Sequence, residues 1–226
     1  MTPGANLIAL DLAGVKRNLE LVSTIDTVSI ERILPRTLKI RVTERHPVAQ
    51  VNMLRSLPSG EVVVAIFQLD EAGYVMQPLD PHLSVLPVGQ VSCELPGLTG
   101  LNFSELQPGH RLASPQALAA LRLIGGFVHS PMAGLVELDA VDVSAPGVLV
   151  ATTGQGSEVT FALDHLDQQL HRWRAIYDWG HTVGKEIGSL DLAVGNNIPV
   201  KWILAGNPPD TIPKSVKPLH TRRKNV

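Results

Sequence analysis

Short apolar runs separated by turn residues limit what this chain can fold into. The strongest apolar run, residues 62–67, has the length of one strand and falls far short of the ~18 residues of a membrane span. Residues 37–43 alternate polar and apolar side chains, which is typical of a strand with one buried face. Because most of the other apolar runs are equally short, and only a few segments have helical spacing, the sequence predicts an α+β fold.

The first part of the chain reads as a small unit of one helix and two strands. Asp11 precedes a predicted helix over residues 12–23, and predicted strands follow at residues 26–31 and 37–43, on either side of a break at Pro35. A two-stranded hairpin is marginal without a third strand or a packing partner. Either the unit leans on the following domain or an element is missing before Met1, and we favour the second interpretation.

The second part of the chain is richer in β pattern. It predicts strands at residues 62–69, 74–76, 135–143, 147–153, 158–163, 188–194 and 198–204, with an irregular stretch at 78–87 and a loop at 95–100. Two helices are expected, one over residues 115–127 capped by Ser114 and one capped by Asp164 that ends near residue 177. Residues after Gly206 are rich in proline and end in basic residues, which is typical of a disordered tail.

The composition and motifs argue against catalysis and against nucleic-acid binding. The net charge is −2 and aromatic residues make up 4% of the chain, so no basic or base-stacking surface is indicated. A single cysteine, Cys93, excludes an intramolecular disulfide. His165, His171 and His181 are not spaced as ligands on one helical face, and Gly154 belongs to a predicted hairpin turn. We therefore expect no enzyme, no metal and no cofactor, although a site assembled from distant residues is not ruled out by a sequence.

Four segments resemble one protein family. Residues 33–49, ILPRTLKIRVTERHPVA, resemble the hairpin that closes the POTRA domain of the FtsQ/DivIB bacterial cell-division proteins. Residues 69–75, 95–100 and the pair 190–192 with 200–202 are similar to three later motifs of that family, in the same order. The family normally carries a cytoplasmic tail, one membrane helix and a complete POTRA domain before its β domain. Because residues 6–11 resemble the middle of the POTRA domain, the resemblance implies a truncated chain or a start assigned too far downstream.

The resemblance also implies an architecture and a function. We expect a POTRA domain without its first strand over residues 1–50, a mostly antiparallel β domain with two helices over 51–205, and a disordered tail over 206–226. The expected function is that of a non-enzymatic divisome scaffold on the periplasmic face of the inner membrane, with a single-pass anchor upstream of Met1. Its expected partner is an FtsB/FtsL-like coiled coil, while the POTRA unit would contact other division proteins. The alternatives are a POTRA-type module of another envelope assembly or secretion machine, a cell-wall hydrolase, and a remnant that no longer binds.

The resemblance places the partner site in the last hairpin, where an edge strand would pair with a strand of the partner. Val194 and Trp202 take positions where the family often has aromatic residues that touch the partner. Pro199 suits an edge strand but could remove one bond available to the partner. An alternative is that the hairpin only completes the sheet and Trp202 caps the core. The predicted site residues are Val194, Gly195, Asn196, Asn197, Ile198, Pro199, Val200, Lys201 and Trp202.

A second candidate surface lies in the first unit. The residues around its hairpin form a basic cluster, made of Arg32, Arg36, Lys39 and Arg41. Such a cluster would contact another division protein or the membrane surface, or it would simply be a solvated strand face.

Overall fold

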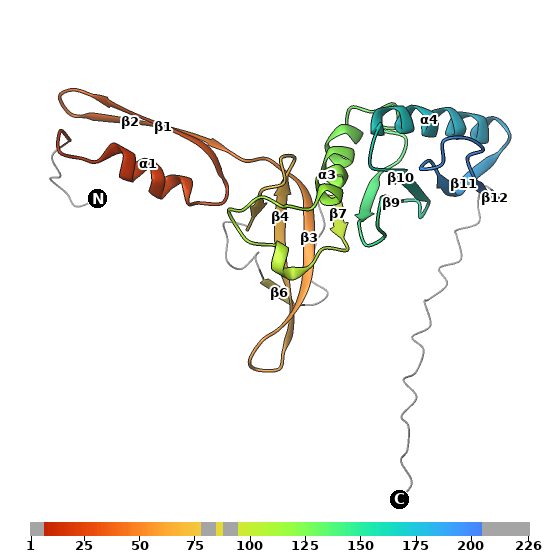
Figure 1. Ribbon diagram of the computed structural model, residues 1–226, viewed down its shortest axis with the longest axis horizontal. Helices are drawn as coiled ribbons and strands as arrows, with labels where there is room; N and C mark the ends of the chain where they lie inside the picture. The colour runs from red at the N-terminus through yellow and green to blue at the C-terminus, as the bar shows by residue number, and fades with distance from the viewer. Residues whose placement is uncertain (1–6, 78–84, 88–94, 205–226) are drawn as a thin grey trace, which may run out of the picture.

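A computed structural model describes residues 7–77, 85–87 and 95–204 of the chain (Figure 1). The predicted tail at 206–226 and Cys93 lie outside the described residues. The described residues form a two-stranded sheet and a ten-stranded sheet with helices packed on them. The predicted α+β class is therefore confirmed.

The first unit contains helix α1, Leu12–Glu20, and strands β1, Ile25–Ile33, and β2, Thr37–Glu44. Asp11 caps the helix as predicted, because its side chain accepts a hydrogen bond of 3.0 Å from the backbone N–H of Ala13. The strands pair antiparallel. Ile40 and Val42 keep 42% and 44% of their surface exposed, so the apolar side of β2, predicted to face inward, is only half covered by the described residues.

The large sheet is built from strands on both sides of one short central strand. Its strands are β3, Pro47–Ser56; β4, Val62–Asp70; β5, Val75–Met76; β6, Val85–Pro87; β7, Gly97–Thr99; β8, Leu138–Asp142; β9, Val148–Thr153; β10, Glu158–Ala162; β11, Lys185–Asp191; and β12, Val200–Leu204. Their order is β12-β11-β10-β9-β8-β7-β3-β4-β5, and β6 pairs with β4. The pairs are mostly antiparallel, but β3–β7, β7–β8 and β10–β11 are parallel.

Two predictions of irregular structure were wrong, because the stretch at 78–87 ends in β6 and the predicted loop at 95–100 contains β7. Strand β7 joins the two halves of the sheet: the N–H of Gln50 donates to the carbonyl of Pro96 at 3.0 Å, and the N–H of Val143 donates to the carbonyl of Thr99 at 3.0 Å. Leu98 is buried at 1% exposure. Three residues between a proline and a glycine are too few to show alternation, so only the neighbouring strands reveal this one.

Helices α3, Pro115–Phe127, and α4, Leu166–Thr182, pack on the large sheet, and a 3-10 turn, η1, spans Phe103–Glu105. Ser114 caps α3 as predicted, accepting from the N–H of Ala117 at 3.3 Å. Asp164 does not cap α4, which was a wrong prediction: His165 takes the N-cap position with φ of 55° and makes no side-chain cap bond. Helix α4 also continues beyond the predicted end at 177.

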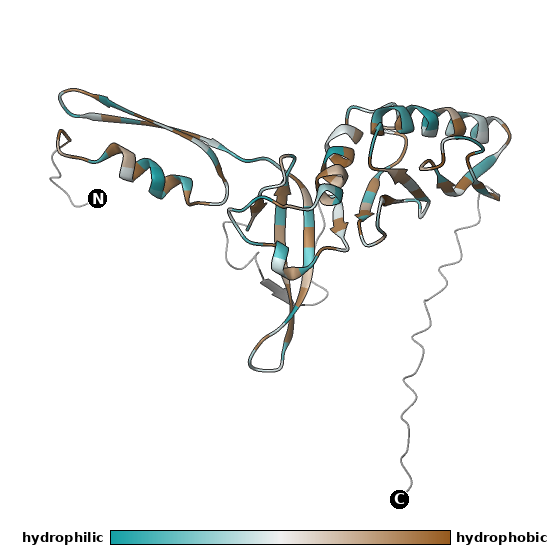
Figure 2. Ribbon diagram, viewed as in Figure 1, coloured by the Kyte–Doolittle hydropathy of each residue, from teal (hydrophilic) through white to brown (hydrophobic). Residues whose placement is uncertain are grey.

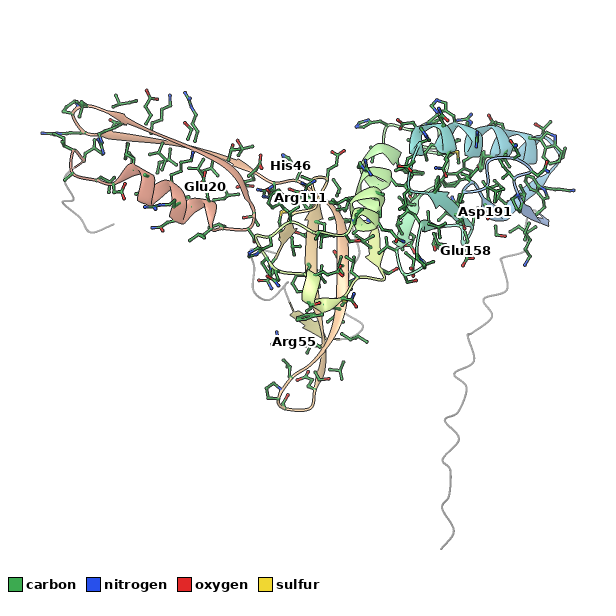
Figure 3. All side chains as sticks on the ribbon, in the orientation of Figure 1. Glu20, His46, Arg55, Arg111, Glu158 and Asp191 are labelled. Carbon is green, nitrogen blue, oxygen red and sulfur yellow. The ribbon has the colours of Figure 1, made fainter. Side chains whose placement is uncertain are left out.

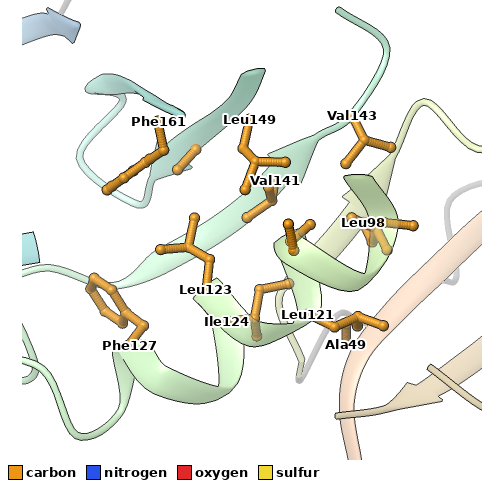
Figure 4. Close-up of a cluster of buried hydrophobic side chains, with 14 of the residues drawn as sticks. Ala49, Leu98, Leu121, Leu123, Ile124, Phe127, Val141, Val143, Leu149 and Phe161 are labelled. Atoms are coloured by element: carbon orange, nitrogen blue, oxygen red, sulfur yellow. The ribbon is translucent and has the colours of Figure 1, made fainter. Parts of the chain in front are cut away.

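The core lies between the helices and the sheet, and Figure 4 shows the part of it beside α3. Side chains of α3, among them Leu121, Ile124 and Phe127, pack against sheet residues such as Val141 and Leu149. Helix α3 buries seven of its residues and α4 buries four, and Figure 2 shows the more hydrophilic colouring of α4. No helix among the described residues is long and apolar enough to cross a membrane.

Candidate partner-binding edge

Strand β12 forms one end of the large sheet. It pairs antiparallel with β11, and within the described part of the chain no strand pairs with its other side. An unpaired strand edge presents N–H and C=O groups that a further strand can bind. The order of strands in the sheet therefore agrees with the predicted edge position of the last strand.

The direction of the backbone groups follows from one hydrogen bond. The N–H of Asp191 in β11 donates to the carbonyl of Pro199 at 3.0 Å, so the backbone groups of Pro199 face β11. Successive residues of a strand direct these groups to opposite sides. Val200 and Trp202 therefore direct their N–H and C=O groups to the open edge. The N–H that Pro199 lacks would have faced β11, so the proline removes a bond from the internal ladder and none from the open edge.

The side chains of β12 face the core on one side. Val200 and Trp202 of β12, and Ile198 just before the strand, are partly buried and pack against the core, which agrees with the prediction that they share one face, although the strand begins at Val200 and not at residue 198. The Trp202 ring lies against Gly180 of α4, and its centroid is 5.3 Å from that of Trp179. Trp202 therefore covers the core, as the alternative interpretation expected.

Trp179 is the aromatic residue that sequence reasoning missed. It is 54% exposed, and its ring packs against that of Trp202 in the last hairpin at an interplanar angle of 56°. A shallow groove between α4 and this hairpin is lined by Ile176, Trp179, Asn196, Ile198 and Trp202, among others. The spacing of Leu170, Trp173, Tyr177 and Gly180 continues the apolar side of α4 past residue 177, and this signal could have extended the helix to Trp179.

The loop of the hairpin differs from the prediction. Strand β11 is Lys185–Asp191 and not residues 188–194, and its pairing with β12 shifts register between Ile187 and Ser189. Gly188 thus lies at a bulge within the strand, whereas sequence reasoning took it as the strand's beginning. Val194 is 40% exposed in the loop, and the loop residues Gly195, Asn196 and Asn197 are also exposed.

Comparison with known proteins finds similarity to FtsQ-type cell-division proteins. The family described as "POTRA domain, FtsQ-type" matches residues 1–45. A curated relative, "Cell division protein FtsQ" of Syntrophotalea carbinolica, is 24% identical over 200 residues, which cover 88% of this chain and 64% of the relative. The beginning of the chain thus matches an FtsQ-type POTRA domain, and most of its length is similar to an FtsQ protein. The chain spans 64% of that relative's length. The activities of whole FtsQ proteins are therefore proposed for this chain and not assigned to it.

The basic cluster predicted around the first hairpin is not one continuous charged surface. Arg32 is partly buried and its guanidinium donates to the carbonyl of Leu10, so it holds the segment before α1 within the unit. Arg36, Lys39 and Arg41 are exposed. Of the four predicted basic residues, these three therefore remain exposed on or beside β2.

The three histidines that were considered as possible ligands lie apart from one another on or beside α4. His165, His171 and His181 are exposed, and the ring Nδ1 of His171 lies 2.8 Å from the carbonyl oxygen of Asp167. Over the residues that the structure describes, no group of three or more potential metal-ligating side chains is found. These histidines contribute nothing to the edge of β12.

Proposed function

We propose that this chain is a non-enzymatic scaffold of the bacterial division machinery. It binds an FtsB/FtsL-like coiled-coil protein through a strand that the partner adds to β12. The match to the FtsQ-type POTRA domain and the similarity to an FtsQ protein support the division role. The open edge of β12 is the observation that carries the binding mode, since Val200 and Trp202 direct backbone groups away from β11.

The proposed site has three parts. The backbone of Val200 and Trp202 provides the hydrogen bonds, and Trp179 provides an exposed apolar surface next to them. The loop with Val194 and Asn196 flanks the beginning of β12. A partner strand with an apolar residue close to its pairing segment would fit this combination, because aromatic surfaces often anchor such contacts.

The remaining expectations about the whole protein are part of the same proposal. The chain works on the periplasmic face of the inner membrane, held by an anchor upstream of Met1, and its POTRA unit over about residues 1–50 contacts other division proteins. The β domain over 51–205 carries the site for the coiled coil. No nucleic acid and no cofactor takes part.

The proposal is tested by removing one outward donor from β12. A charged residue at position 200 would be a poor choice, because Val200 packs against the core and a buried charge would unfold the edge. Val200→Pro instead removes the N–H that faces the open edge and keeps an apolar side chain. Val200→Ala is the matched control, because it trims the side chain but keeps the N–H.

Binding is measured between the folded chain and the extracytoplasmic FtsB/FtsL segment of the same organism, by calorimetry, with circular dichroism to verify folding. One lost hydrogen bond at an interface is worth about 1–1.5 kcal/mol, and the proline ring also obstructs the partner strand. We expect at least roughly tenfold weaker binding for Val200→Pro and a change below about threefold for Val200→Ala. Equal affinity of both variants would contradict strand pairing at β12.

A further inference from the structure

The small sheet and the large sheet are joined by Arg45 and His46, which lie between the end of β2 and the start of β3. Figure 3 labels His46 at this junction, where the chain passes from one sheet to the other. The hydrophobic core cluster runs from Val48 to Trp202 and includes no described residue of the small unit. The two parts are therefore not held together by a shared apolar core, and polar contacts at the junction gain importance.

Arg45 makes the main polar contacts at this junction. Its Nη1 lies 2.8 Å from Oδ2 of Asp70 at the end of β4 and 3.2 Å from Oδ1 of Asp26 in β1. Its guanidinium carbon lies 3.9 Å from the centroid of the Tyr74 ring. The Arg45 and Asp70 side chains are only 13% and 10% exposed. One guanidinium thus contacts residues of both sheets in a largely buried position.

The partners of Arg45 in the large sheet are themselves held in place. Oδ1 of Asp70 accepts from the backbone N–H of Tyr74 at 2.7 Å, and the N–H of Asp70 donates to the carbonyl of Tyr74 at 3.2 Å. The backbone of Tyr74 pairs with that of Arg111 in an isolated antiparallel β-bridge. The Nε of Arg111 donates to the carbonyl of Ala72 at 2.6 Å. Several hydrogen bonds therefore hold the turn between β4 and β5 in place where it contacts the guanidinium.

On the side of the small unit, Arg45 is tied to the beginning of β1. Its own N–H donates to the carbonyl of Thr24 at 2.8 Å, and its side chain holds Asp26. Asp26 and Asp70 meet at the same nitrogen atom. Without the guanidinium, two carboxylates would face each other across the junction, and attraction would become repulsion.

We propose that Arg45 is a positioning residue that sets the direction of the small unit relative to the large sheet. By holding β1 and the β4–β5 turn together, it fixes the distance between the small unit and the open edge of β12. Partners bound at the two ends of the molecule would then be kept at a defined separation. The inference depends only on the junction and stands whether or not β12 binds a coiled coil.

The test measures distances between spin labels on the full chain by pulsed electron spectroscopy. Cys93 is first replaced by alanine, because it is the single cysteine. One pair of labels, at Lys39 and Gln168, spans the junction, and a control pair, at Ser59 and Gln168, lies within the large sheet and its helix; all three positions are exposed. The Arg45→Ala, Arg45→Lys and Asp26→Asn variants are compared with the unsubstituted chain.

We expect Arg45→Ala to broaden the Lys39–Gln168 distance distribution at least about twofold and to leave the control distribution unchanged. Arg45→Lys should broaden it less, since lysine keeps the charge but not the planar contact with Tyr74. Asp26→Asn should also broaden it, and this variant leaves the pair between Arg45 and Asp70 intact. An unchanged Lys39–Gln168 distribution in Arg45→Ala would overturn the inference. Equal broadening of both pairs would overturn it too, because Arg45 would then stabilise the large sheet rather than orient the small unit.

Discussion

Gln169 offers the sharpest test of how α4 is attached to the sheet. Its side chain is 4% exposed and makes three hydrogen bonds with the backbone. Its Oε1 accepts from the N–H of Ala162 at 2.9 Å, and its Nε2 donates to the carbonyls of Ala162 at 3.2 Å and Asp164 at 2.6 Å. These bonds join the end of β10 and the segment before α4 to the first turn of the helix.

Gln169→Leu fills nearly the same volume but removes all three bonds. At about 1 kcal/mol for each hydrogen bond, the free energy of unfolding should fall by about 3 kcal/mol. The backbone groups of Ala162 and Asp164 would be left without partners, which adds to the cost rather than reducing it. The adjacent Gln168 is exposed, so Gln168→Leu is the matched control and should change stability by no more than about 0.5 kcal/mol.

The assay is urea denaturation at 25 °C, followed by tryptophan fluorescence, since Trp173 is buried in the core at 1% exposure. The midpoint should move to lower urea in Gln169→Leu with little change in the slope. A loss below about 1 kcal/mol in Gln169→Leu would refute the reasoning, because it would mean that water or a small movement of α4 satisfies the freed groups.

Three glycines provide further predictions. Gly100→Ala should destabilise the chain by several kcal/mol more than Gly147→Ala in the same denaturation assay. Both glycines have positive φ. A Cβ at Gly100 would lie 2.5 Å from the backbone nitrogen of Ser144, whereas the space at Gly147 is open. Similar losses in the two variants would show that the contact with Ser144 relaxes freely. Gly180→Ala should cost about 1–3 kcal/mol by overpacking and displace the Trp202 ring, which a loss of near-ultraviolet dichroism would reveal; an unchanged spectrum would contradict the placement of Trp202.

The elements with local signals were predicted well. Asp11 and Ser114 cap their helices as expected, because capping depends on a side chain and backbone groups within three residues. The hairpin of β1 and β2 also follows from its own alternation and from the break at Pro35. The family resemblance rested on such local segments, and the matches to FtsQ-type sequences confirm it.

The errors lie where distant residues decide the structure. Strand β7 exists because β3 and β8 lie on either side of it. It leaves no pattern within a window of neighbouring residues. The end of α4 is different, because its apolar spacing continues from Tyr177 to Gly180 and is a local signal.

The candidate edge at β12 likewise combines features that are local in the sequence with features that depend on the whole fold. The sequence by itself determined that the last two described strands form a hairpin with apolar residues at alternate positions, since alternation is a local property of strands. Only the tertiary structure decided that β12 lies at the end of the sheet, that Pro199 faces β11 and that Trp202 faces the core. The reason is physical: strand order and the direction of backbone groups depend on which strands pair, and those pairs are selected by packing across the whole domain.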